Sequence, residues 1–136
     1  MNIIFKNRNK KILIAIMIVF LLLVDNTLVS ADTTPQGTVG GTAVIGYSYC
    51  SSNIAGAMTA SLNYDSEIMV GVEVAFRAIN PNTGEYYIEY KNSYGISSTS
   101  VTFVVPNGYN CYDISAHHFA EKYGQQWEDH TYETFP

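Results

Sequence analysis

The sequence predicts an all-β protein, an antiparallel β-sandwich or small barrel of about seven strands. Three observations favour this class. All 11 tyrosines lie after residue 31, in a part of the chain rich in Val, Ile and Thr, which suit half-buried strands. Gly, Asn or Pro interrupts that part at short intervals. No window repeats apolar residues at i, i+3, i+4 and i+7, so an amphipathic helix is not predicted.

The first 31 residues are predicted to be a signal peptide. Basic residues in 1–11 precede an unbroken apolar run over 12–24, and Val29-Ser30-Ala31 ends the segment as small residues do at a cleavage site. As a helix the run would be roughly 20 Å long, which is short of the ~30 Å hydrocarbon core of a bilayer. We therefore expect a single secreted, extracellular domain over residues 32–136, with no stable membrane anchor.

The charge balance excludes several partners. The chain has 7 Lys and Arg and 12 Asp and Glu. Removal of the predicted leader takes away four basic residues and one acidic residue, so 3 basic and 11 acidic residues remain and the formal charge is −8. So acidic a protein is repelled by nucleic acids and anionic lipid surfaces. No nucleic-acid partner is expected, and no basic amphipathic segment indicates membrane disruption.

The first half of the domain contains four predicted strands. One covers 39–49, and a second covers 58–64 and is closed by a turn at 63–66. The clearest alternation follows at 68–79, and Pro81-Asn82-Thr83-Gly84 then reverses the chain into a strand over 85–92. One face of the 68–79 strand carries Ile68, Val70, Val72, Val74, Phe76 and Ala78.

The second half begins with polar residues 92–100, which predict a long loop. A strand over 101–105 ends at Pro106-Asn107-Gly108. Tyr123-Gly124-Gln125 predicts a turn into a last strand over 127–135. Before that turn, one strand face is expected to carry Tyr112, Ile114, Ala116, His118 and Ala120.

Cys50 and Cys111 are predicted to form a disulfide. An even number of cysteines in an exported chain favours one bridge, which here would close a loop of about 60 residues and contribute about 4 kcal/mol. The chain has no second cysteine pair for a metal and no C-x-x-C for redox chemistry.

A metal site is the weaker interpretation of the C-terminal histidines. If the last two strands pair about Gly124-Gln125, residues whose numbers sum to about 248 or 249 lie opposite each other. His118 would then face His130, and Glu121 would face Glu128, a set that could bind Zn²⁺. The spacing matches no zinc motif, and cross-strand pairing of exposed His with acids explains the residues more simply. No metal and no cofactor is therefore expected.

Nothing in the sequence predicts a catalytic centre. It has no G-x-S-x-G motif, and Asp113, Ser115 and His117 alternate along one strand face rather than converging on a pocket. We therefore expect the protein not to be an enzyme.

The tyrosines are the candidate ligand contacts. Tyr47, Tyr86, Tyr87 and Tyr94 belong to a set larger than a small core needs, and exposed Tyr provides contact area at low entropic cost. Such rings can stack on sugars or on peptide strands. The alternative is that they pack across strands within the sheet.

The C-terminal part of the chain carries a family resemblance. Ser115-Ala116-His117-His118 is followed by Tyr123-Gly124 and then by Trp127. From about Gly40 onward the chain resembles small exported proteins of Gram-positive bacteria and their prophages, some of them called bacteriocin-like in the manner of the lactococcins. The resemblance implies a leader and a Gly/Thr/Tyr-rich all-β body, and it transfers no catalytic residue. The chain departs from the pattern in its two cysteines and its adjacent histidines.

Three functions remain open at this point. The favoured one is a secreted, non-enzymatic β-sandwich that binds an extracellular protein or glycan. The second is an antagonistic protein, either bacteriocin-like or an inhibitor of a secreted enzyme. The third is a metal-dependent enzyme that uses His118, His130 and an acid.

Overall fold

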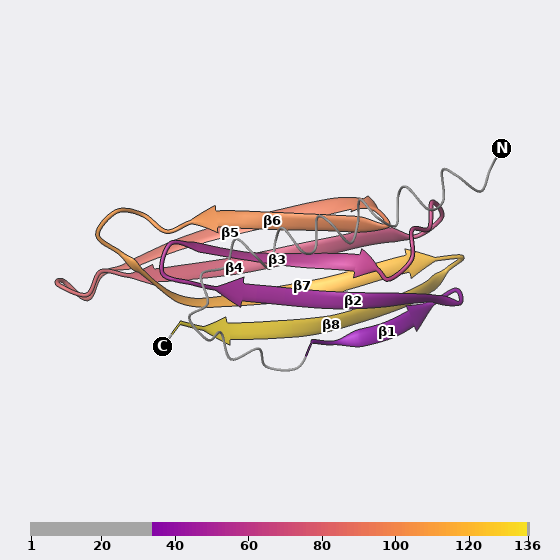
Figure 1. The fold of residues 1–136 in the computed structure, drawn as a ribbon, viewed down its shortest axis with the longest axis horizontal. Coiled ribbons are helices and arrows are strands. Elements are labelled where there is room, and N and C mark those ends of the chain that lie inside the picture. Colours follow the sequence, from indigo (N-terminus) through magenta and orange to yellow (C-terminus); the bar gives the residue numbers. More distant parts are fainter. Residues whose placement is uncertain (1–33, 136) are drawn as a thin grey trace.

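The chain forms a sandwich of two antiparallel sheets that pack face to face (Figure 1). The structure is a computed structural model and describes residues 34–135, so the predicted signal peptide lies outside the described residues. One sheet has the order β1-β2-β3-β6 and the other the order β5-β4-β7-β8. The predicted all-β sandwich is confirmed, with eight strands in place of about seven. The strands are β1 (Gln36–Val39), β2 (Thr42–Cys50), β3 (Ile54–Ser61), β4 (Met69–Ile79), β5 (Tyr86–Ile96), β6 (Ser98–Val104), β7 (Asn110–Lys122) and β8 (Gln125–Thr134).

The core lies between the two sheets. The alternation predicted for 68–79 is confirmed, because the even-numbered residues of β4 are buried and its Glu73 and Arg77 are exposed. Phe76 of β4 stacks on Phe103 of β6 with ring centroids 5.0 Å apart. Residues 34–135 contain no helix of the length and apolarity needed to cross a membrane.

A disulfide joins the two sheets through the predicted cysteine pair. Cys50 ends β2 and Cys111 lies near the start of β7, with their Cα atoms 6.4 Å apart. Both residues are buried in the main hydrophobic cluster. The bond therefore closes the core at one end of the sandwich.

Two predicted strands near the N-terminus have different boundaries in the structure. The single strand expected over 39–49 is two strands, because Gly40 (φ 53°) and Gly41 (φ 78°) form a turn between β1 and β2. The strand expected over 58–64 is β3, which ends at Ser61 and leaves Leu62 and Tyr64 exposed.

The prediction of a long loop over 92–100 is wrong. β5 continues to Ile96, and β6 begins at Ser98 after the single residue Ser97, whose φ is 67°. Ser97 is buried at this corner, and its hydroxyl lies 2.5 Å from that of Ser61. The segment looks like a loop in sequence because β5 is an edge strand with little burial, so polar residues are tolerated there.

The set of β7 residues predicted to face the core is wrong at Tyr112, because this strand contains a bulge. Arg77 pairs with Asp113 and Ala78 with Cys111, so Tyr112 has no partner on β4. The extra residue reverses the alternation, which lets Cys111 and Ile114 both face the core. Tyr112, expected to lie beside Ile114, is 39% exposed.

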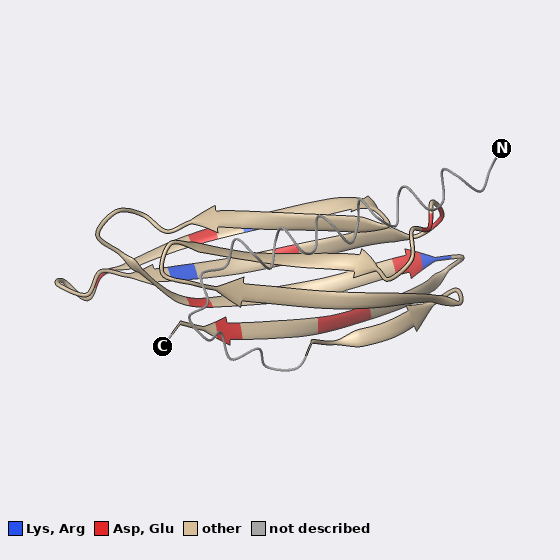
Figure 2. Cartoon of the chain, viewed as in Figure 1, with Lys and Arg blue, Asp and Glu red and all other residues tan. Residues whose placement is uncertain are grey.

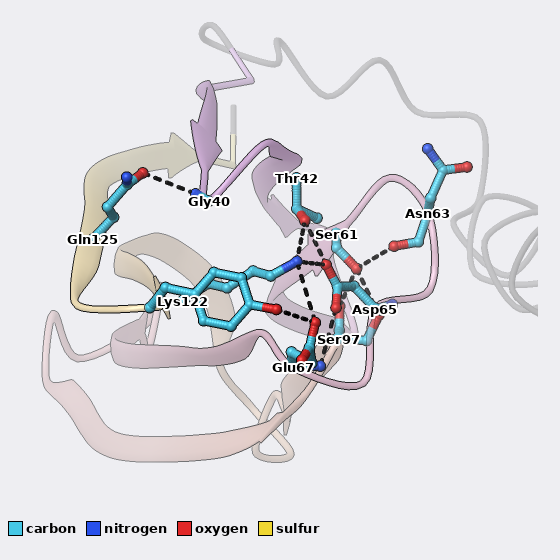
Figure 3. A network of polar contacts seen from close by, with 10 residues as sticks. Gly40, Thr42, Ser61, Asn63, Asp65, Glu67, Ser97, Lys122 and Gln125 are labelled. Atoms are coloured by element: carbon cyan, nitrogen blue, oxygen red, sulfur yellow. Dashed lines mark hydrogen bonds and ion pairs between the residues drawn. The ribbon is translucent and has the colours of Figure 1, made fainter.

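A polar network holds the end of the sandwich where β7 turns into β8 (Figure 3). Lys122 is buried, and its Nζ lies 2.5 Å from Asp65 Oδ2 and 3.2 Å from Thr42 Oγ1. Thr42 also donates a hydrogen bond to Asp65. Hydrogen bonds from Lys122 and then from Thr42 lower the pKa of Asp65 to about 2. The network ties β2, the loop after β3 and the end of β7 together.

Candidate functional site

The candidate site lies on the outer face of the β5-β4-β7-β8 sheet, which points away from the other sheet. The strand register places odd-numbered residues of β4 and of β7 after its bulge on this face, together with even-numbered residues of β5 and β8. We call this surface the outer face. Its most exposed large hydrophobic side chains, all at least 48% exposed, are Tyr86, Ile88, Tyr90, Tyr94, Ile96, Tyr132 and Met69.

The larger of two hollows on the outer face has a volume of about 490 Å³. Its floor is formed by Ala75 and Ser115, which are direct partners in the pairing of β4 with β7. Because both side chains are small, the larger residues around them stand above the floor. Tyr90 of β5 lines one side, and His117 and His130 line another.

A smaller hollow of about 280 Å³ lies next to the first. Phe119, Trp127 and Glu128 are among the residues that line it. Glu73 and His117 line both hollows and are direct partners between β4 and β7. The two hollows therefore meet at this central pair.

His117 is held by contacts on several sides. Its Nε2 lies 3.0 Å from Glu128 Oε2, and its Nδ1 lies 3.6 Å from Glu73 Oε2. Its ring stacks on that of His130 with a centroid separation of 4.6 Å and an interplanar angle of 13°. Phe119 lies on its other side along β7, with ring centroids 5.7 Å apart.

An aromatic strip continues from His117 toward β5. Phe119 lies directly over Gly71, where an added Cβ would come within 1.9 Å of the ring, so only glycine leaves room for it. Tyr94 packs against Phe119 at 5.4 Å and donates a hydrogen bond of 3.0 Å to Glu73 Oε1. This hydrogen bond to a carboxylate is the main reason that the pKa of Tyr94 is raised.

The other end of the outer face is occupied by a charged cluster. Arg77 donates two hydrogen bonds to Asp113, one of them from Nε at 2.8 Å, and Tyr132 donates a third at 2.9 Å. The guanidinium also lies over the rings of Tyr86 at 6.0 Å and Tyr112 at 5.2 Å. Its charge is therefore balanced by a carboxylate, and two aromatic rings flank it.

The four predicted contact tyrosines do not share one surface. Tyr86 and Tyr94 lie on the outer face, and each is at least half exposed. Tyr87 lies on the opposite side of β5, against Phe76 at 6.4 Å, and Tyr47 belongs to β2 in the other sheet. Whether these residues touch a ligand stays a prediction.

Sequence reasoning missed the larger hollow, although it had considered Ser115 and His130 for other chemistry. Ala75 carries no chemical signal of its own, and the role of Glu73 depends on its partner across the sheet. One signal was present: alternation over 85–92 puts Tyr86 and Tyr90 on the same side, and Tyr90 is 75% exposed.

The proposed metal set is not assembled, because the register of the last hairpin differs by one residue from the expected one. His117, not His118, lies opposite His130, and His118 lies opposite Asp129. A shift of one residue sends a side chain to the other face, so His118 points into the core and His130 into solvent. Glu121 pairs with Gln126 and Glu128 with Phe119, not with each other. Within the described residues, no group of three or more His, Cys, Asp or Glu could hold a metal ion.

His118 forms a polar centre between the two sheets instead. It is fully buried against Gly46, where an added Cβ would lie 2.6 Å from its Cγ. Thr59 donates its hydroxyl proton to the carbonyl of Gly71, so it accepts a hydrogen bond from Nδ1–H of His118 at 2.9 Å. Thr131 then donates to Nε2 at 2.8 Å. Both nitrogens of a neutral imidazole are thereby satisfied.

Burial lowers the pKa of His118 from 6.5 to about 4. Repulsion from His117 and His130 acts in the same direction, whereas Asp129 opposes it. His118 is therefore a structural residue that stays neutral near pH 7.

No protein-family model matches the chain, and no curated protein matches it significantly. The resemblance drawn from Ser115 to Trp127 therefore stays a prediction, and the candidate site rests on its own geometry.

Proposed function

We propose that this protein is an exported, non-enzymatic module that binds an extracellular glycan on the outer face. The observation that carries the proposal is the hollow of about 490 Å³ floored by Ala75 and Ser115 and flanked by Tyr90, His117 and His130. Exposed rings around a concave surface, with a few fixed polar groups, are typical of sites that bind small ligands.

The polar groups of this face support binding in place of catalysis. Asp113 is held by Arg77 and Tyr132, so it is not available to activate Ser115 or His117. His117 is fixed by its hydrogen bond to Glu128 and by the stacked ring of His130. Groups held in this way can orient a ligand without taking part in bond cleavage.

The test is binding of purified protein to insoluble cell-wall polysaccharides and to soluble oligosaccharides. Tyr90→Ala removes one wall of the hollow, and Ser115→Trp fills it; each should weaken binding about tenfold or more, which corresponds to about 1.4 kcal/mol. The matched control is Tyr64→Ala, because Tyr64 is 53% exposed but lies in the loop between β3 and β4. Absence of binding to every glycan, or equal binding by the Tyr90 and Tyr64 variants, would contradict the proposal.

A second candidate, an antagonist that docks on a secreted enzyme or a cell-surface protein, is favoured by β5. This strand is at the edge of its sheet, and most of its residues are exposed, including Ile88 and Ile96. An exposed, apolar edge strand can pair with a strand of another protein. Inhibition of growth or of a secreted hydrolase that is lost in Ile88→Glu but kept in Tyr90→Ala would favour this candidate.

A further inference from the structure

Two hydrogen-bond acceptors face each other where the hollows meet. Glu128 is a carboxylate and accepts only, so the 3.0 Å contact places the proton of neutral His117 on Nε2. Nδ1 then carries a lone pair, and it lies 3.6 Å from Glu73 Oε2, which is also an acceptor. Glu73 Oε1 already accepts the hydroxyl of Tyr94. With His117 neutral, the pair Glu73 Oε2 and His117 Nδ1, both partly exposed, is open to donors from water or from a ligand.

The charges around this pair disfavour an anionic ligand. The described residues contain three Lys and Arg, whose places along the strands Figure 2 marks in blue. The charged group of each is engaged elsewhere. Arg77 binds Asp113, and Lys122 is buried against Asp65. Lys91 lines the larger hollow, but its Nζ donates to the carbonyl of Thr102 at 2.9 Å and pairs with Glu89 at 3.2 Å. A phosphate, sulfate or uronate placed between Glu73 and Glu128 would meet like charge with no free cation to balance it.

Neighbouring hydroxyl groups of a sugar ring are the donors that fit. We infer that the protein recognises an uncharged glycan through two adjacent hydroxyls, one donating to Glu73 Oε2 and the other to His117 Nδ1; this rests on the glycan-binding function proposed above. The two hydroxyls replace a contact between acceptors with two hydrogen bonds, one of them to a charged oxygen.

The ligand spans at least two sugar rings. Because Glu73 and His117 line both hollows, a chain that crosses this pair extends into each of them. On one side it meets Tyr90, and on the other Phe119. A single sugar would use only one of these aromatic walls, so a disaccharide is the smallest ligand expected to bind well.

The experiment is calorimetric titration with matched oligosaccharides. Cellotetraose, mannotetraose and maltotetraose are uncharged and keep adjacent ring hydroxyls. Chitotetraose differs from cellotetraose by an acetamido group in place of one of two adjacent ring hydroxyls. Tetragalacturonate differs from the neutral sugars by a carboxylate. We expect at least one neutral tetrasaccharide to bind about tenfold more tightly than both of these probes.

Variants separate this inference from the proposed function. Glu73→Gln and His117→Gln should each weaken binding of the neutral tetrasaccharide about tenfold. Glu85→Gln, which removes an exposed carboxylate just before β5 that lines neither hollow, should change affinity less than twofold. Binding of chitotetraose or tetragalacturonate that equals the neutral sugars and depends on Tyr90 would overturn the inference and leave the proposed function standing. Loss of all glycan binding would overturn both.

Discussion

Acidification from pH 7 to pH 5 should destabilise this protein through one residue, His118. Folding buries its imidazole in neutral form, with a pKa lowered from 6.5 to about 4. Below pH 6.5 the unfolded chain binds a proton at this residue and the folded protein does not, so stability falls as the pH falls. The loss begins near pH 6.5 and is complete below about pH 4.

The size of the effect follows from the same two pKa values. At about 1.4 kcal/mol per pKa unit, the difference between 6.5 and about 4 amounts to about 3 kcal/mol. About 2 kcal/mol of this should already be lost at pH 5, where the unfolded imidazole is charged and the folded one is still mostly neutral. Such a loss is a large share of the 5–15 kcal/mol typical of a small domain.

Urea unfolding at pH 7, 6 and 5, followed by the fluorescence of the single Trp127, measures the loss. His118→Gln removes the titrating group, so its stability should be lower at pH 7 but should fall by about 2 kcal/mol less between pH 7 and 5. His130→Gln is the control, because it removes a solvent-exposed imidazole of the same strand pair.

A direct titration covers the case in which His118→Gln does not fold. NMR of the unmodified protein should show the His118 ring protonating near pH 4. A midpoint near 6.5 for this ring, or equal pH dependence in the unmodified protein and His118→Gln, would refute the reasoning.

Three further predictions concern stability. Reducing the Cys50–Cys111 bond, which spans a sequence separation of 61, should raise the intact mass by two daltons and lower the unfolding free energy by about 4 kcal/mol in urea titrations. Gly46→Ala would place a Cβ against buried His118, so it should cost about 1–3 kcal/mol, and an unchanged melting temperature would contradict that packing. Asp65→Asn should destabilise the protein at pH 7 but not near pH 2, because the carboxylate, with its pKa lowered to about 2, stabilises the fold only while ionised.

Much of the fold follows from local signals. Alternation identified β4, because one side of that strand packs on the core and the other meets solvent. Turn residues marked the reversals at Gly84 and Gly124, which have φ angles of 75° and 73°. β5 beyond residue 92 could not be found in this way, since an edge strand with both sides largely exposed loses its apolar pattern.

Much less of the candidate site could be predicted. The sequence indicated that histidines and acids would gather near the last strands, but the chosen set depended on a register that was off by one residue. That error placed His118 opposite His130 in place of His117, so a buried, hydrogen-bonded imidazole was interpreted as a possible metal ligand. Ala75 and Ser115 could not be recognised as the floor of a hollow, because a hollow exists only relative to the larger side chains around it.

The sequence by itself determined that the domain is built of strands and that Cys50 has one other cysteine with which it can pair. These properties depend on residue type and spacing along the chain. Tertiary structure alone decided the bulge at Tyr112, the register of the last hairpin and the meeting of Glu73 with His117. The physical reason is that alternation records which side of a strand faces the core, whereas the neighbour across the sheet is set by packing between segments far apart in sequence.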